Sequence, residues 1–86
     1  MNIYQKIINH YGEKKQIEKA VDELRELKNS LNEYLLSNEN KDALFDVFCD
    51  VMNAMVYLQI IFNFDSASIA NRMDEKLEIV IDNLCK

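Results

Sequence analysis

The sequence predicts an all-α protein, an antiparallel bundle of three long helices with a short helix in front, completed by oligomerisation. It contains no proline and a single glycine, Gly12. No stretch alternates between apolar and polar residues as a half-buried strand does. Apolar residues instead recur every three or four positions in successive segments, which is the helical period. At 86 residues the chain has the length of one small domain, and we assign residues 1–86 to it.

The first two segments are separated by Gly12. Asn2 to Tyr11 carries its isoleucines and tyrosines at helical spacing, and Gly12 ends this segment as a C-terminal cap would. The second helix is expected from about Lys14 to Ser37. Its unbroken series of apolar positions consists of Ile17, Ala20, Val21, Leu24, Leu27, Leu31, Tyr34 and Leu35.

A polar break at residues 38–40 precedes the central helix, which we expect from Asp42 to Asn63 with Asn40 as its N-cap. This helix is apolar around most of its circumference, so we expect neighbours on more than one side and Cys49 in the core. The last helix follows a cap at Asp65 or Ser66. Its apolar positions are Ile69, Met73, Leu77, Val80, Ile81 and Leu84.

The composition indicates self-association. Hydrophobic residues make up 49% of the chain, including four Phe, four Tyr and four Met. This is more apolar side-chain surface than a monomer of this size readily buries. We therefore expect a homodimer or a dimer of dimers.

Charge and hydropathy exclude several other classes of partner. The formal net charge is −5, so the basic footprint of a duplex nucleic-acid binder is absent. No signal peptide is visible, and the longest apolar run is interrupted by Asp50, Asn53 and Gln59, which leaves it short of a membrane span. We expect a soluble, cytoplasmic protein without a membrane partner. The only histidine, His10, lacks a second His or Cys at metal-ligand spacing.

Polar residues form one stripe along the central helix, with the spacing i, i+4, i+8, i+11 and i+15. They are Asp42, Asp46, Asp50, Asn53 and Tyr57. The stripe is either the solvated face of a mostly buried helix or the wall of a cleft that holds a cation.

Glu23 and Glu26 bear on this choice, because they lie about one turn apart on the preceding helix. Two antiparallel helices joined by a short loop would bring them within reach of the stripe, where carboxylates from both helices can bind Mg²⁺. The same spacing also occurs on ordinary exposed helix faces.

Three runs of the chain resemble one protein family over nearly the whole length: QIEKAVDELRELKNSL, FDVFCDVMNAMVYLQIIF and MDEKLEIVIDNL. They are similar to the MazG-like nucleoside triphosphate pyrophosphohydrolases, particularly small phage and prophage members. The resemblance implies an oligomeric all-α enzyme that uses Mg²⁺ to cleave NTPs or dNTPs to the monophosphate and pyrophosphate. Its motif is ExxE on one helix and ExxD on the next. Glu23 and Glu26 match the first half, and Asp50 matches the last position of the second.

The chain departs from the family pattern at two positions. Val47 stands where the family has a glutamate, and Ile79 stands where small members carry an arginine after the lysine that Lys76 matches. Asp46 matches an acid often found beside the missing glutamate, but it points about 100° away from position 47 around the helix. Both departures fall on the catalytic apparatus.

For a working site, the resemblance assigns Glu23, Glu26 and Asp50 to Mg²⁺ binding and catalysis, with Asp46 as a fourth ligand and Mn²⁺ as a substitute metal. Lys76 would contact a phosphate, and Gln16 and Asn53 would bind a base or sugar. Each of these three is equally consistent with an ordinary surface residue. Two other functions stay open: an inactive relative that binds a nucleotide, and a prophage protein that binds a host defence protein.

Overall fold

The computed structural model describes residues 2–85, in which there are four helices and no strand. The helices are α1 (Ile3–Tyr11), α2 (Glu13–Ser37), α3 (Lys41–Ile61) and α4 (Ser66–Leu84). The expected all-α class, with three long helices after a short one, is confirmed. The expected helix ends differ from the observed ones by at most two residues.

Short polar residues and Gly12 define the helix ends. The side chain of Asn2 accepts a hydrogen bond from the Gln5 backbone N–H at 2.8 Å, which caps α1. Gly12 has φ of 93°, a conformation that favours glycine, and its N–H donates to the Ile8 carbonyl at 2.7 Å. This geometry turns the chain directly from α1 into α2.

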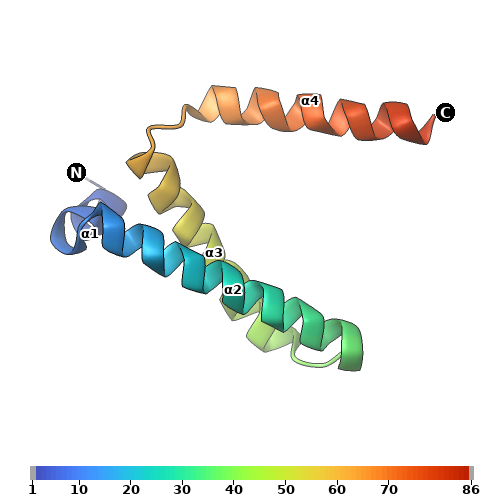
Figure 1. The fold of residues 1–86 in the computed structure, drawn as a ribbon, viewed down its shortest axis with the longest axis horizontal. Coiled ribbons are helices and arrows are strands. Elements are labelled where there is room, and N and C mark those ends of the chain that lie inside the picture. Colours follow the sequence, from blue (N-terminus) through green and yellow to red (C-terminus); the bar gives the residue numbers. More distant parts are fainter. Residues whose placement is uncertain (1, 86) are drawn as a thin grey trace.

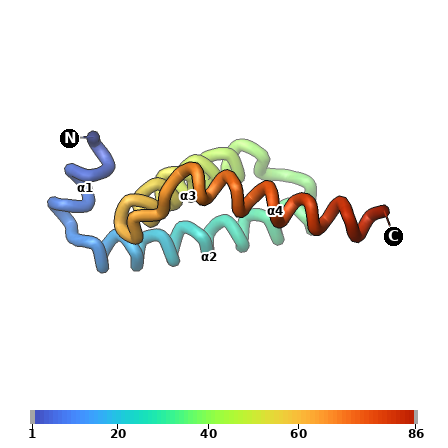
Figure 2. The backbone as a smooth tube through the Cα atoms, turned by 90° about the horizontal axis from the view of Figure 1, so that it is seen from above, coloured from blue at the N-terminus to red at the C-terminus, as the bar shows by residue number. Residues whose placement is uncertain are grey.

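Helices α2 and α3 form a hairpin around residues 38–40. Asn38 and Asn40 have φ values of 58° and 71°, in the left-handed region that asparagine tolerates better than most residues. Asn38 ends α2 by donating its N–H to the Tyr34 carbonyl at 2.8 Å. Asn40 occupies the expected N-cap position of α3, but its side chain makes no capping hydrogen bond. This short turn sets α2 and α3 side by side (Figures 1 and 2).

The packed part of the chain consists of α1, α2 and α3, and α1 contacts both helices of the hairpin. Its buried apolar residues are few and mostly small: Ile8, Ala20, Val51 and Ala54. Ala20 on α2 and Ala54 on α3 let the two backbones approach without filling the space between them. The core therefore lies where the three helices meet.

Helix α4 stands apart from the other three. No residue of α4 has its Cα within 8 Å of a residue in another described helix, and Figure 1 shows α4 projecting away from the hairpin. Helix α3 is contacted by α1 and α2 but by no Cα of α4 within that distance, so the neighbours expected around α3 are present only in part. The expectation of a buried Cys49 is wrong for the same reason, because its side of α3 is exposed.

The central apolar run was expected to fall short of a membrane span, but by length and composition α3 is long and apolar enough to cross a membrane. Only 11% of its most apolar stretch is buried by the rest of the described chain. Asp46 and Asp50 lie within this helix. An aspartate at the centre of a membrane span costs roughly 2.5–3.5 kcal/mol, so the two acids weigh against that arrangement.

Candidate functional site

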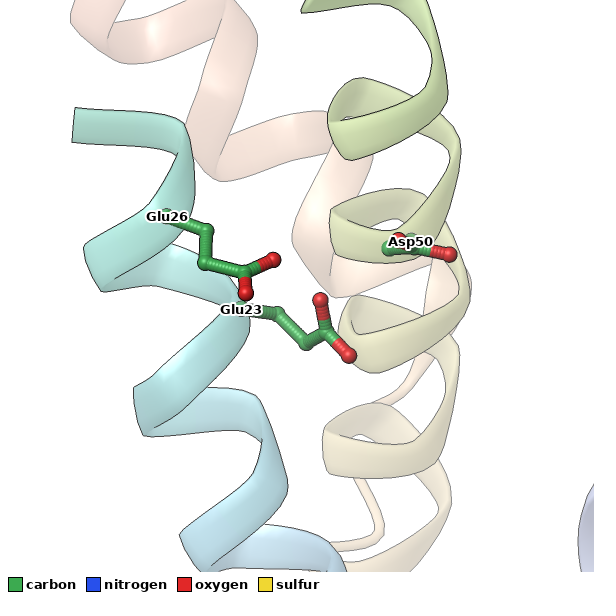
Figure 3. A group of neighbouring side chains, drawn as sticks. All are labelled: Glu23, Glu26 and Asp50. Atoms are coloured by element: carbon green, nitrogen blue, oxygen red, sulfur yellow. The ribbon is translucent and has the colours of Figure 1, made fainter. Parts of the chain in front are cut away.

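Three carboxylates from the two helices of the hairpin converge. Glu23 and Glu26 come from α2 and Asp50 comes from α3, and one oxygen of each lies within 4.8 Å of the others. Figure 3 shows both glutamate side chains pointing from α2 toward α3, where Asp50 stands. The helical period explains this arrangement, because residues three apart share one face of α2 and the tight turn presents that face to α3. The polar stripe of α3 was interpreted either as a solvated face or as the wall of a cleft that holds a cation, and the position of Asp50 favours the second interpretation.

Glu23 is the least exposed of the three acids. Burial raises the pKa of Glu23 above its ordinary value, and the carboxylates of Asp50 and Glu26 raise it further. The nearby Lys19 ammonium acts in the opposite direction. The carboxylates that act on Glu23 outnumber the single ammonium that acts on it, which is a situation that a bound cation relieves.

A cavity of about 80 Å³ adjoins Glu23 and Asp50. Ala20 of α2 and Ala54 of α3 both line it, and their small side chains leave this space between the helices. The rest of its wall is polar or aromatic, made by Gln16, Lys19, Asn53 and Tyr57. Its volume suits a few water molecules or a small polar group.

Gln16 is the one buried polar side chain among the described residues, with an exposed fraction of 4%. No hydrogen bond from its amide to another described residue is found, yet none of its polar atoms is sealed from solvent. Since Gln16 lines the cavity, its amide has hydrogen-bonding capacity available there.

Helix α1 holds the far side of the cavity in place. The hydroxyl of Tyr4 donates a hydrogen bond to Oδ1 of Asn53 at 2.7 Å. The rings of Tyr4 and Tyr57 meet edge to face, with their centroids 5.3 Å apart. The bond fixes which end of the Asn53 amide faces Tyr4 and leaves its NH₂ group to donate elsewhere.

A larger groove of about 560 Å³ continues from the cavity between α1 and α2. The two spaces share Gln16, Lys19 and Tyr57 as lining residues. The groove also has Ile7 and Tyr11 in its wall, so it offers apolar and aromatic surface. Its volume lies within the range of small-molecule sites, whereas the cavity beside the acids is much smaller.

The other expected site residues lie away from the cluster. Asp46 is exposed and is not one of the converging carboxylates. Val47 is half-buried. Lys76 lies on α4, where it lines a surface pocket with Arg72 and Met73, and Ile79 on the same helix is 59% exposed. Within one chain, α4 thus brings no cation to the acids.

Sequence reasoning assigned no role in the site to Lys19, Tyr4 or Tyr57. Lys19 and Tyr57 line the cavity, and Tyr4 contacts Asn53 and Tyr57 in its wall. A signal for Lys19 was present, because Gln16, Lys19 and Glu23 follow one another at i, i+3 and i+7 on one face of α2. Tyr57 continues the stripe of Asp50 and Asn53. The contact of Tyr4 with Asn53 depends on how α1 folds back, which no local pattern shows.

Comparison of the sequence with models of known protein families, with curated proteins and with solved structures gives no match. The functional argument therefore depends on the geometry of the hairpin and on the residues that line it.

Proposed function

We propose that this protein is a Mg²⁺-dependent nucleoside triphosphate pyrophosphohydrolase, of the kind that the three MazG-like runs suggest. The observation that carries the proposal is the convergence of Glu23, Glu26 and Asp50 within 4.8 Å from two adjacent helices. Ligand oxygens around one Mg²⁺ lie about 3–4 Å apart at Mg–O distances of roughly 2.1 Å. Small rotamer changes, or bridging water, would bring these three carboxylates to that spacing, so the donor set fits the metal.

The surroundings of the acids support a nucleotide as the ligand. Bound Mg²⁺ would neutralise triphosphate charge and make water a better nucleophile. Lys19 lies close enough to Glu23 to affect the pKa of that carboxyl, and the Lys19 side chain lines both the cavity and the groove. It is placed to attract a phosphate as a point charge. The free amide capacity of Gln16 and Asn53 suits the polar edge of a base or sugar, and the groove beside Tyr11 has room for the ring.

The test is pyrophosphate release from a panel of NTPs and dNTPs with Mg²⁺ or Mn²⁺. We expect turnover by the natural chain and its loss in Glu26→Gln. Glu33→Gln is the matched control, because Glu33 is an exposed glutamate on the same helix outside the cluster. Equal activity in the two variants would refute the assignment of the site.

Two observations favour a second function, the binding of a Mg²⁺–nucleotide without turnover. Val47 contributes no ligand, and Lys76 lies on a helix that does not reach the acids within one chain. A metal-dependent thermal shift with a nucleotide but no pyrophosphate would support this binder. Absence of both turnover and thermal shift would reject both functions and leave the binding of a host protein.

A further inference from the structure

We propose that Tyr4 sets the base selectivity of the site. It holds the Asn53 amide with its NH₂ group toward the cavity, so that an oxo-base such as uracil is preferred over the amino-base cytosine. Tyr4 acts through Asn53 as a positioning residue, and its role rests on the proposed binding of a nucleotide at the acidic cluster.

The hydrogen bond between Tyr4 and Asn53 fixes the orientation of the amide. The Tyr4 hydroxyl donates to Oδ1 of Asn53 at 2.7 Å, the usual length of a well-formed O–H···O bond. Tyr4 is itself held by the edge-to-face contact of its ring with that of Tyr57, at a centroid distance of 5.3 Å. Turning the amide by half a rotation would bring its NH₂ group to the hydroxyl and lose this hydrogen bond.

The acceptor end of the Asn53 amide therefore faces Tyr4, and its donor end remains for a ligand. Asn53 lines the cavity, whereas Tyr4 does not. No hydrogen bond from the NH₂ group of Asn53 to another described residue is found. A ligand atom that meets this group in the cavity must then accept a hydrogen bond.

Gln16, the second amide of the cavity, does not impose the same choice. Its side chain is buried, lines both the cavity and the groove, and makes no hydrogen bond to another described residue. An amide without a fixed partner can turn either its oxygen or its NH₂ group toward a ligand. Gln16 thus adapts to the ring nitrogen of the base, which carries a proton in uracil and none in cytosine. The selection between the two bases falls to Asn53.

The base is the part of a nucleotide that lies toward these two amides. Gln16 precedes Glu23 by seven residues and Asn53 follows Asp50 by three, so both amides lie on the α1 side of the acids. The separations are about 10 Å along α2 and about 4.5 Å along α3. Phosphates bound at the acids leave the base at the α1 end, where the groove beside Tyr11 offers aromatic surface. The cavity of about 80 Å³ has room for an exocyclic oxygen of that base.

The binding of two α,β-imido nucleotides with Mg²⁺, measured by isothermal titration calorimetry, tests this role. The analogues of dUTP and dCTP share the sugar and the phosphates, and their blocked α–β linkage gives affinities with or without turnover. We expect the natural chain to bind the uracil analogue at least ~10-fold more tightly, because the cytosine amino group would face the NH₂ group of Asn53. Tyr4→Phe keeps the ring but frees the amide to turn, so the ratio of affinities should fall below about threefold.

Two further variants make the test specific. Tyr34→Phe is the matched control, because it removes a hydroxyl from α2 outside the cavity and the groove, and it should keep the natural ratio. Asn53→Asp still accepts from Tyr4 but presents an oxygen in place of the NH₂ group, so the cytosine analogue should become the tighter ligand. Each ratio compares two ligands on one protein, so a loss of stability or an added charge that weakens both leaves it unchanged.

Equal ratios in Tyr4→Phe and Tyr34→Phe would overturn the role of Tyr4 and leave the proposed function standing. So would a natural chain that prefers the cytosine analogue or binds both equally. A change in Tyr4→Phe confined to the ratio between ribonucleotide and deoxyribonucleotide analogues would also overturn it, because Asn53 would then meet the sugar. Absence of binding by every analogue would overturn both the role of Tyr4 and the proposed function.

Discussion

Glu23→Gln should stabilise the protein at neutral pH when no divalent cation is present. The Glu23 carboxylate lies within 4.8 Å of those of Glu26 and Asp50. Two like charges at about that distance repel by roughly 0.9 kcal/mol at the dielectric constant of water and roughly 3.5 kcal/mol at an effective value of 20. Because the group is partly exposed, screening keeps each pair near the lower figure. Removing both repulsions should raise the free energy of unfolding by about 1–2 kcal/mol, which corresponds to about 5–10 °C in Tm for a chain of this size.

The pH dependence has a definite sign. The pKa of Glu23 in the folded protein is raised from 4.5, so the folded state binds this proton more tightly than the unfolded state. Its contribution to the free energy of unfolding therefore decreases as pH rises from about 4.5 through the raised pKa. The advantage of the variant over the natural chain should be absent at pH 3 and complete at pH 7.5.

Thermal melts in EDTA and in Mg²⁺, at one protein concentration, measure both effects. The natural chain should gain stability with Mg²⁺ at pH 7.5, and Glu23→Gln should gain much less. Glu33→Gln again serves as the control for removing one negative charge from α2. The reasoning is refuted if Glu23→Gln is no more stable than Glu33→Gln in EDTA, because the three carboxylates would then not repel one another in solution.

Three further substitutions test separate parts of the structure by thermal melts and circular dichroism. Val47→Glu should lower the free energy of unfolding in EDTA by about 1–3 kcal/mol, because Val47 is half-buried. The variant should also gain more stability from Mg²⁺ than the natural chain does. An unchanged gain with Mg²⁺ would place position 47 outside the site. Gly12→Ala should lower the free energy of unfolding by about 1 kcal/mol. The cost comes from the backbone conformation with φ of 93°, since an added Cβ would meet nothing within 4 Å. Asp65→Ala should cost about 1 kcal/mol and reduce the helix content of α4, whereas Asp65→Asn should keep the cap.

The helices and their ends were predictable because local chemistry determines them. Gly12 can adopt the positive φ that ends α1, and Asp65 accepts the Ser68 N–H that begins α4. The convergence of Glu23, Glu26 and Asp50 followed from helical spacing together with a short turn, which leaves α2 and α3 little choice but to lie side by side.

The position of α4 could not be predicted in the same way. Its apolar period shows which side seeks burial, but not which surface covers it, and that surface is absent from the single chain. Cys49 was misplaced for the same reason, since the apolar circumference of α3 indicates burial without saying by what. The bond between Tyr4 and Asn53 joins residues 49 positions apart, beyond the reach of any local pattern.

The small core connects the proposed metal site with the expected self-association. Among residues 2–85 the buried apolar side chains are Ile8, Ala20, Val51 and Ala54, while three carboxylates repel one another beside the two alanines. Because so little apolar surface is buried, the core provides little free energy to offset the loss of chain entropy on folding and the repulsion among the three carboxylates. Dimerisation would add apolar burial, and a cation would remove the repulsion, so each should raise the stability of the hairpin. The two effects separate experimentally: the first depends on protein concentration in EDTA, and the second depends on Mg²⁺ at fixed protein concentration.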